Sequence, residues 1–293
     1  MCDRKDLPMK RTEITTDCVC DLPEEYLRAR DVDVMYFSIN TDTGRFKDGF
    51  VLTSANLLEY LEEGGRMART AAPEPREYKE FFERKLANCD ELIHIAMSSH
   101  VGLSCQNANR ALNLMGEEAK RVRVIDSHHL STGMGHMVVR AVEMRDEGRP
   151  AAEIVKELEE LRGRISTSFI TRNAEYLFRN GWVSDRVRGL CARLRLHPVL
   201  AIKNGRMTVK MLFFGNYENA VMRYTRGQLK HYSRIDTTRL FVTHAGSTVK
   251  MVTAVKTEAQ KLCAFDEVIV TKASATISGN CGPGTVGVIF VNL

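Results

Sequence analysis

The chain has 293 residues, of which 44% are hydrophobic and 27% are charged, and its net charge is +5. This composition indicates a globular protein with a sizeable core and excludes disordered and fibrous classes. The length favours two domains, since single cores rarely grow beyond roughly 250 to 300 residues. No apolar run reaches the roughly 18 residues that a membrane span needs, and residues 1–10 are polar, so we expect a cytoplasmic protein without membrane insertion.

Charge and cysteine patterns argue against nucleic acid and metal as partners. The basic residues are not interleaved with aromatic residues, as single-stranded nucleic acid would require. The eight cysteines form no CxxC pair, and Cys18 and Cys20 stand alone without two further ligands. We therefore expect reduced thiols, no metal site and no cofactor.

Short β-rich runs alternate with helical stretches through the first half of the chain. Strands are expected over 11–19, 32–39, 91–97 and 121–126. Apolar residues spaced by about 3.6 predict helices over 54–63, 77–87, 106–115, 134–145 and 151–162. This alternation predicts a three-layer α/β domain in which helices cover both faces of a parallel sheet.

The pattern changes after residue 166. Six further strands are expected over 169–172, 198–202, 207–210, 239–244, 267–272 and 286–291. Asn204 and Gly205 between the second and third are typical of a two-residue hairpin, which makes that pair antiparallel. The sequence thus predicts a second α/β domain with a mixed six-stranded sheet, and we place the domains at 1–165 and 166–293.

Polar loops recur where an open α/β sheet binds its ligands, at the carboxyl ends of strands. They cover residues 16–18, 70–73, 98–106 and 126–129. Each alone is explained by helix caps and turns, but their recurrence indicates a binding edge. The glycine-rich stretch 279–284 before the last strand fits either a tight turn or a close backbone approach to a ligand. It lacks the lysine and the helix of a phosphate loop.

In this order, the motifs resemble the DegV family of fatty-acid-binding proteins. They are an Ile-Thr-Thr-Asp opening strand, a Thr-x-x-Pro loop, a Ser-Ser loop ending in Gln, Ile-Asp-Ser followed by Gly-x-Gly, and a terminal Gly-Pro-Gly. The resemblance implies that a long-chain fatty acid such as palmitate lies in a tunnel between the domains. It also implies a bacterial protein that is not itself an enzyme and that presents the carboxylate to a separate ATP-dependent fatty acid kinase.

The resemblance further implies a set of lipid-binding positions, some of which depart from the family pattern. Gly102 replaces the serine that holds the carboxylate, Trp182 replaces an arginine, and Asn280 replaces a histidine. The implied positions are Thr70, Gly102, Leu103, Ser104, Trp182, Asn280 and Gly282. Burial contributes about 0.8 kcal/mol per methylene, so we expect the tail to keep binding while the head group decides selectivity.

Two other functions stay open from the residues. Asp17, Ser127 and either His128 or His129 are the residue types of an acyl hydrolase, although the chain has no Gly-x-Ser-x-Gly elbow. A binding protein for another apolar metabolite would also fit the altered head-group positions. The arginines between 186 and 195 indicate either a solvated helix face or a docking surface for an acidic partner.

Overall fold

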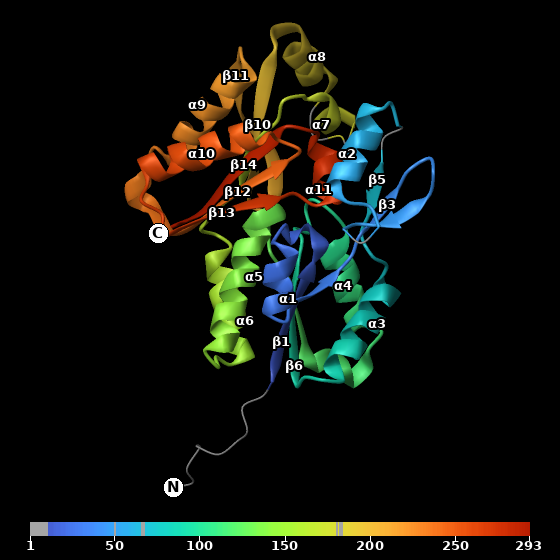
Figure 1. Cartoon of the computed structure of the whole chain (residues 1–293). Coiled ribbons are helices and arrows are strands. Elements are labelled where there is room, and N and C mark those ends of the chain that lie inside the picture. Colours follow the sequence, from blue (N-terminus) through green and yellow to red (C-terminus); the bar gives the residue numbers. More distant parts are fainter. Residues whose placement is uncertain (1–10, 50, 66–67, 180, 182–183) are drawn as a thin grey trace.

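The structure is a computed structural model that describes residues 11–49, 51–65, 68–179, 181 and 184–293. Two sheets, each with its own helices, lie one above the other (Figure 1). The polar start at 1–10 lies outside the described residues. Within the described part of the chain, no helix has the length and apolar character of a membrane span.

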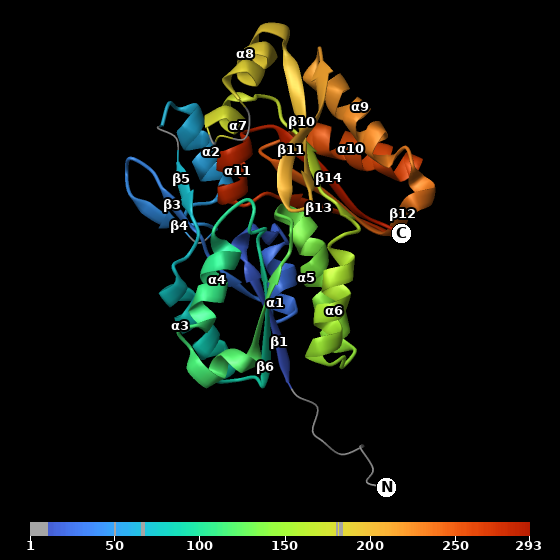
Figure 2. The same cartoon turned by 180° about the vertical axis from the view of Figure 1, so that it is seen from behind.

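The lower sheet is parallel throughout, with the strand order β2-β1-β6-β7. Its strands are β1 (Thr12–Asp17), β2 (Asp33–Met35), β6 (Glu91–Ala96) and β7 (Val122–Asp126). Its helices are α1 (Glu24–Ala29), α3 (Pro75–Leu86), α4 (Ser104–Leu112), α5 (Ser131–Asp146) and α6 (Ala151–Leu161), with short helices η1 (Cys18–Cys20) and η2 (Gly116–Arg121). Helices α5 and α6 cover one face and α3 and α4 the other (Figure 2), which confirms the three-layer parallel domain.

A small antiparallel sheet follows β2, in the order β4-β3-β5. Its strands are β3 (Ser38–Asn40), β4 (Arg45–Lys47) and β5 (Arg69–Ala71), and α2 (Ser54–Glu62) lies between β4 and β5 in the chain. The single strand expected over 32–39 is wrong, because the chain leaves the parallel sheet after Met35 while the apolar pattern continues. The loop expected over 70–73 likewise begins inside β5.

The upper sheet is mixed and has seven strands, in the order β11-β10-β9-β14-β12-β13, with β8 paired to β14. The strands are β8 (Ile165–Ser166), β9 (Ser168–Ile170), β10 (Leu196–Lys203), β11 (Arg206–Phe214), β12 (Ile235–Ala245), β13 (Glu267–Lys272) and β14 (Thr285–Asn292). The six expected strands are confirmed, and the two-residue β8 is the addition. Asn204 and Gly205 have φ of 48° and 77°, the positive values that a tight hairpin turn between β10 and β11 needs.

Helices cover one face of the mixed sheet, and the parallel domain meets the other. The remaining helices are α7 (Glu175–Arg179), α8 (Asp185–Leu194), α9 (Tyr217–Leu229), α10 (Val249–Leu262) and α11 (Ala275–Cys281), with the short η3 (Tyr232–Arg234). Helices α9 and α10 cover the outer face, whereas α5 and α11 contact the inner face. In the stretch 279–284, the first three residues are helical and only the last three form the turn.

Candidate functional site

A narrow apolar cavity lies on the inner face of the mixed sheet, against the start of α5 and against α11. Its volume is about 30 Å³, roughly the space of one water molecule, so a larger occupant must widen it by displacing side chains. Its apolar walls include Leu130, Phe169, Met207, Ala245, Ile277 and Ile289. Only Leu130 and Ser131 among the lining residues come from the first half of the chain.

Five hydroxyl side chains also line this cavity, and each already has a hydrogen-bond partner in the protein. The pairs are Ser131 with Asp21, Thr167 with His129, Ser168 with Tyr224, Thr243 with Thr132, and Thr285 with the carbonyl of Cys281. The cavity therefore offers mainly hydrocarbon surface to an occupant. It suits an apolar chain, whereas a carboxylate buried there would lack donors.

The cavity opens where two hydrophobic clusters meet. Met207 and Ile277 are half-buried, pack against both clusters and line the cavity. Ala72 and Val101, from the first half of the chain, pack against one of the same clusters. We call the side of the cavity formed by Met207 on β11 and Ile277 on α11 its mouth.

A polar pair lies close in sequence to the lining residue Ile277, at the end of α11. The Asn280 side chain donates to the Thr276 carbonyl at 2.7 Å and to Thr70 Oγ1 at 3.4 Å. Asn280 lies one helical turn beyond Ile277 on α11, so its amide lies on the side of the helix that carries the mouth. Since Thr70 accepts this bond, its own hydroxyl hydrogen can be donated to a ligand.

Two buried carboxylates of the first half hold the start of α11 in place. Asp48 accepts from the N–H groups of Ala275 and Thr276 at 2.9 and 2.8 Å, and Asp21 accepts from the Ser274 N–H at 2.8 Å. Burial raises the pKa of Asp21 to about 7 and also raises the pKa of Asp48. These contacts fix α11 and therefore the position of Asn280 against Thr70.

The three consecutive positions 102–104 have different surroundings. The Gly102 N–H donates to the Ser98 carbonyl at 3.2 Å, and Leu103 is 57% exposed. Ser104 is fully buried and donates to Asp17, which also accepts from the Tyr78 hydroxyl. The structure therefore brings Thr70 and Asn280 together but engages Ser104 in the core of the parallel domain.

Of the other two expected positions, only Gly282, directly after α11, is described by the structure. Gly282 has φ of 81°, and a Cβ built there would lie 2.5 Å from the ring of Tyr176, so both conformation and space favour glycine. Its N–H donates to the Ser278 carbonyl. Trp182 lies outside the described residues.

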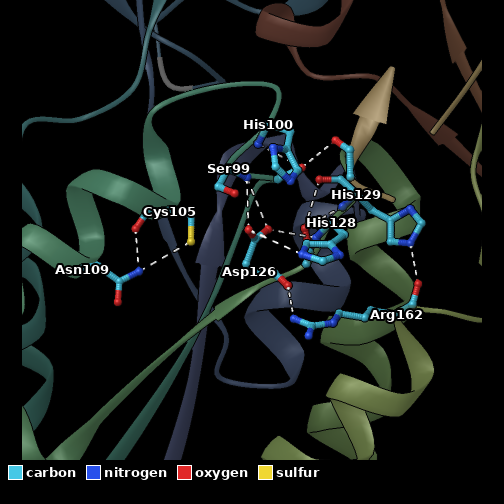
Figure 3. Close-up of polar contacts among 11 residues, drawn as sticks. Ser99, His100, Cys105, Asn109, Asp126, His128, His129 and Arg162 are labelled. Carbon is cyan, nitrogen blue, oxygen red and sulfur yellow. Dashed lines mark hydrogen bonds and ion pairs between the residues drawn. The ribbon is translucent and has the colours of Figure 1, made fainter. Parts of the chain in front are cut away.

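Loops after β6 and β7 form a dense polar network at the edge of the parallel sheet (Figure 3). Asp126 accepts from the N–H groups of Ser99 and His128, and the Arg162 guanidinium donates to the Asp126 carbonyl at 3.2 Å. The Ser98 hydroxyl donates to the Gly205 carbonyl at 2.7 Å. This network holds the tip of the β10–β11 hairpin, and with it Met207, at the mouth.

Known proteins share both the sequence pattern and this architecture. The model of the DegV family of uncharacterised proteins matches residues 11–293. The chain belongs to the DegV family. A DegV domain-containing protein of Caldanaerobacter subterraneus is 30% identical over 201 residues, which cover 69% of this chain and 71% of the relative.

Two solved DegV structures illustrate the likeness in fold. A DegV family protein from Thermus thermophilus, described as binding fatty acid, is 26% identical with a TM-score of 0.87, over 97% of this chain and 100% of that one. The fatty acid kinase B3 protein of Streptococcus pneumoniae, loaded with linoleic acid, is 15% identical with a TM-score of 0.83, over 96% and 99%. At that identity the second likeness shows the fold alone.

The described side chains of the alternative hydrolase set form no Ser-His-Asp relay in this DegV chain, because Ser127 bonds only to the backbone of His129. The buried Ser127 hydroxyl donates to the His129 carbonyl, while the His129 ring contacts the Arg162 carbonyl and Thr167. Burial lowers the pKa of His129 to about 4. Asp17 faces the Tyr78 and Ser104 hydroxyls instead. Each side chain thus has a structural partner, and the described residues contain no group of three or more metal-binding side chains.

Sequence reasoning missed most of the cavity wall. Phe169, Ala245 and Ile289 lie in strands whose apolar residues are interspersed with hydroxyl residues, so no period of two marks the inner face. Ile277 lies three residues before Asn280, and the helical spacing within α11 was the only local signal that could have joined them.

Proposed function

We propose that this DegV protein binds a long-chain fatty acid, with the tail in the apolar cavity and the carboxylate at the mouth beside Thr70 and Asn280. The observation that carries the proposal is a cavity whose hydroxyl groups are all paired within the protein, next to a polar pair that can take a head group. The Thermus relative, described as binding fatty acid, supports the choice of ligand.

Tail and head group contribute differently to this binding. A sixteen-carbon tail gains on the order of 10 kcal/mol from burial before ordering costs are subtracted. A hydrogen bond to a charged carboxylate contributes about 1.5 to 3 kcal/mol. Affinity therefore comes mainly from the tail, while Thr70 and Asn280 give selectivity for a free acid over an ester or alcohol.

The proposed role is to present the carboxylate and not to react with it. We infer that a separate ATP-dependent fatty acid kinase phosphorylates the acid at the mouth, as the family resemblance implies. The proposed division of labour follows the two halves: 1–165 contributes the head-group loops and 166–293 contributes most of the cavity wall.

Denaturing extraction of freshly purified protein, followed by mass spectrometry, tests the ligand. We expect close to one fatty acid per chain. Met207→Trp should plug the mouth and lower the lipid content at least about tenfold, since an indole in the channel displaces the tail. Met211→Trp is the matched control, because Met211 lies on the same strand, 45% exposed and away from the cavity.

Two outcomes would reject the proposal. One is a wild-type protein that carries no lipid and binds no added fatty acid. The other is equal loading of the two tryptophan variants, which would place the acid elsewhere. Recovery of a different apolar metabolite in stoichiometric amount would favour the alternative ligand class.

A further inference from the structure

A second hollow lies on the far side of the turn that follows α11. It is a cleft of about 430 Å³ between α7, α8, the start of β10 and the start of α9. Three arginines line it, Arg172, Arg188 and Arg195, against a single carboxylate, Glu175. Arg188 also pairs with Asp185 at 2.6 Å, so the excess positive charge of the cleft comes from Arg172 and Arg195.

Aromatic rings hold two of these guanidinium groups. Arg188 lies 4.2 Å above the centre of the Phe178 ring, and Arg172 lies 5.1 Å from the centre of the Tyr217 ring. A stacked guanidinium keeps a fixed plane and loses little freedom when it pairs with a carboxylate. The cleft thus presents arginines that are already oriented.

The lining carboxylate does not neutralise all three arginines. Glu175 pairs with Arg179 at 2.9 Å and with Arg188 at 3.6 Å. Among the residues that the structure describes, no carboxylate lies within ion-pair distance of Arg172 or Arg195. These two positive charges remain for a partner.

Arg195 has an unusual backbone conformation for its residue type. Its φ is 48°, in the left-handed region that glycine adopts most readily, at the junction between α8 and β10. Glycine at this position would serve the turn better. An arginine there is consistent with a role for its side chain.

The walls of the cleft are joined to each other and to the turn at α11. One His197 ring nitrogen lies 3.0 Å from the Arg172 carbonyl and the other 3.0 Å from the Gly215 carbonyl. The Tyr217 hydroxyl donates to the Gly284 carbonyl at 2.6 Å. The cleft is thus rigidly connected to the loop that ends the head-group helix.

Apolar side chains stand exposed at the rim of the cleft. Leu194 is 44% exposed and directly precedes Arg195. Phe214 is 67% exposed, pairs with Leu196 across the β10–β11 ladder and directly precedes Gly215. A surface with unpaired arginines and exposed apolar groups fits a partner that carries both carboxylates and apolar side chains.

We propose that this cleft docks an acidic segment of a partner protein, whose carboxylates pair with Arg172 and Arg195 and whose apolar side chains cover Leu194 and Phe214. The inference rests on the proposed function only for the partner's role. That role is to reach the fatty acid carboxylate at the cavity mouth, which lies across the turn 282–284 from the cleft. Binding of the segment itself does not require a bound lipid.

Selection from a random twelve-residue peptide library displayed on phage tests the proposal. The wild-type protein is the target, and the double variant Arg172→Ala/Arg195→Gly is used for counter-selection. We expect enriched peptides to combine Asp or Glu with Leu, Phe or similar residues. Enrichment of neutral or basic peptides, or of none that distinguish the two proteins, would overturn the proposal.

Fluorescence anisotropy with one enriched peptide separates the contributions. Arg172→Ala and Arg195→Gly should each weaken binding about tenfold, as expected for loss of one charge-assisted pair. Arg193→Ala is the matched control, since Arg193 lies in the last turn of α8, two residues before Arg195, but does not line the cleft. Arg195→Gly should keep or raise the melting temperature, which separates lost binding from lost folding.

Competition with inorganic phosphate distinguishes a small-anion site from a docking site. The proposal predicts that phosphate at millimolar concentration displaces the peptide weakly and that Phe214→Ser weakens peptide binding at least about threefold. Full displacement by phosphate together with an unaffected Phe214→Ser would identify a small-anion site and overturn the docking proposal. Lipid content should stay unchanged in all these variants. A wild-type protein that carries no fatty acid would therefore contradict the proposed function but leave the docking proposal standing.

Discussion

Two polar clusters of similar composition have different roles in this molecule. The Asp17 cluster combines a carboxylate with Tyr78 and Ser104, is fully buried, and saturates its groups internally. The pair formed by Thr70 and Asn280 is half-buried, and the Thr70 hydroxyl, which accepts from Asn280, can still donate its own hydrogen to a third group. Hydroxyl groups near a strand end are thus found in both, and only burial and hydrogen-bond saturation separate a structural cluster from a candidate ligand contact.

The largest effect should come from breaking the buried cluster. Asp17→Ala leaves the Ser104 hydroxyl and the Met97 N–H without their acceptor and leaves the Tyr78 hydroxyl with Ser104 alone, and should lower the free energy of unfolding by about 4 kcal/mol. Urea unfolding measures it. Asp126→Ala is the control, because Asp126 is partly exposed and should cost about 1 kcal/mol. A loss below 1 kcal/mol at Asp17 would show that its cluster is not structural.

A pH effect sharpens the comparison at the anchor of α11. Burial raises the pKa of Asp21 from 3.8 to about 7, so the folded state holds this proton more tightly than the unfolded chain. Its contribution is complete below the unfolded pKa and is lost as the pH rises through about 7. Asp21→Asn should therefore gain stability relative to wild type between pH 4 and pH 8, by up to about 4 kcal/mol.

Chemical unfolding of both proteins at each pH provides the measurement. The difference in unfolding free energy between the two proteins isolates the contribution of Asp21. His129 titrates in both proteins: its pKa is lowered to about 4, so its contribution to stability is lost as the pH falls. A difference that does not change with pH would mean that Asp21 titrates normally in the folded protein.

A third change tests the contact between the hairpin tip and the loops of the parallel sheet. A Cβ at Gly205 would lie 2.7 Å from the His100 ring and 3.0 Å from Ser98 Oγ, at a φ of 77°. Gly205→Ala should destabilise the protein by about 2 kcal/mol in thermal unfolding. Gly227→Ala in the last turn of α9 meets open space and should stabilise by up to about 1 kcal/mol. Equal changes in melting temperature in both variants would show that the contact between the hairpin tip and these loops does not contribute to stability.

The smallest effect on stability should fall at the mouth, where selectivity is expected to change instead. Thr70→Val removes one hydroxyl and should lower the affinity for a free fatty acid about tenfold while that for its methyl ester stays the same. Competition with a fluorescent fatty acid measures both. Ser104→Ala should leave this ratio unchanged, since its hydroxyl faces Asp17. If Ser104→Ala lowers the preference for the free acid and Thr70→Val does not, the carboxylate is bound by Ser104 and not by Thr70.

The sequence alone was sufficient for the architecture of the parallel domain and for the family. Alternating strands and helices predict a covered parallel sheet, and Asn204 with Gly205 predicts the hairpin, because both signals are local. The ordered motifs gave the resemblance for the same reason. The three-residue strands β3, β4 and β5 were missed, since strands this short carry too little pattern to be recognised.

Tertiary structure alone decided which polar residues meet. Thr70 and Asn280 are 210 positions apart and come together because Asp48 and Asp21 anchor α11 against the first half. The cavity wall was equally hidden, since its apolar residues are interspersed with hydroxyl residues such as Thr243 and Thr285 and no period of two marks them. Local periodicity reports that a side chain is buried, but the partner it meets across the chain depends on packing that no short segment contains.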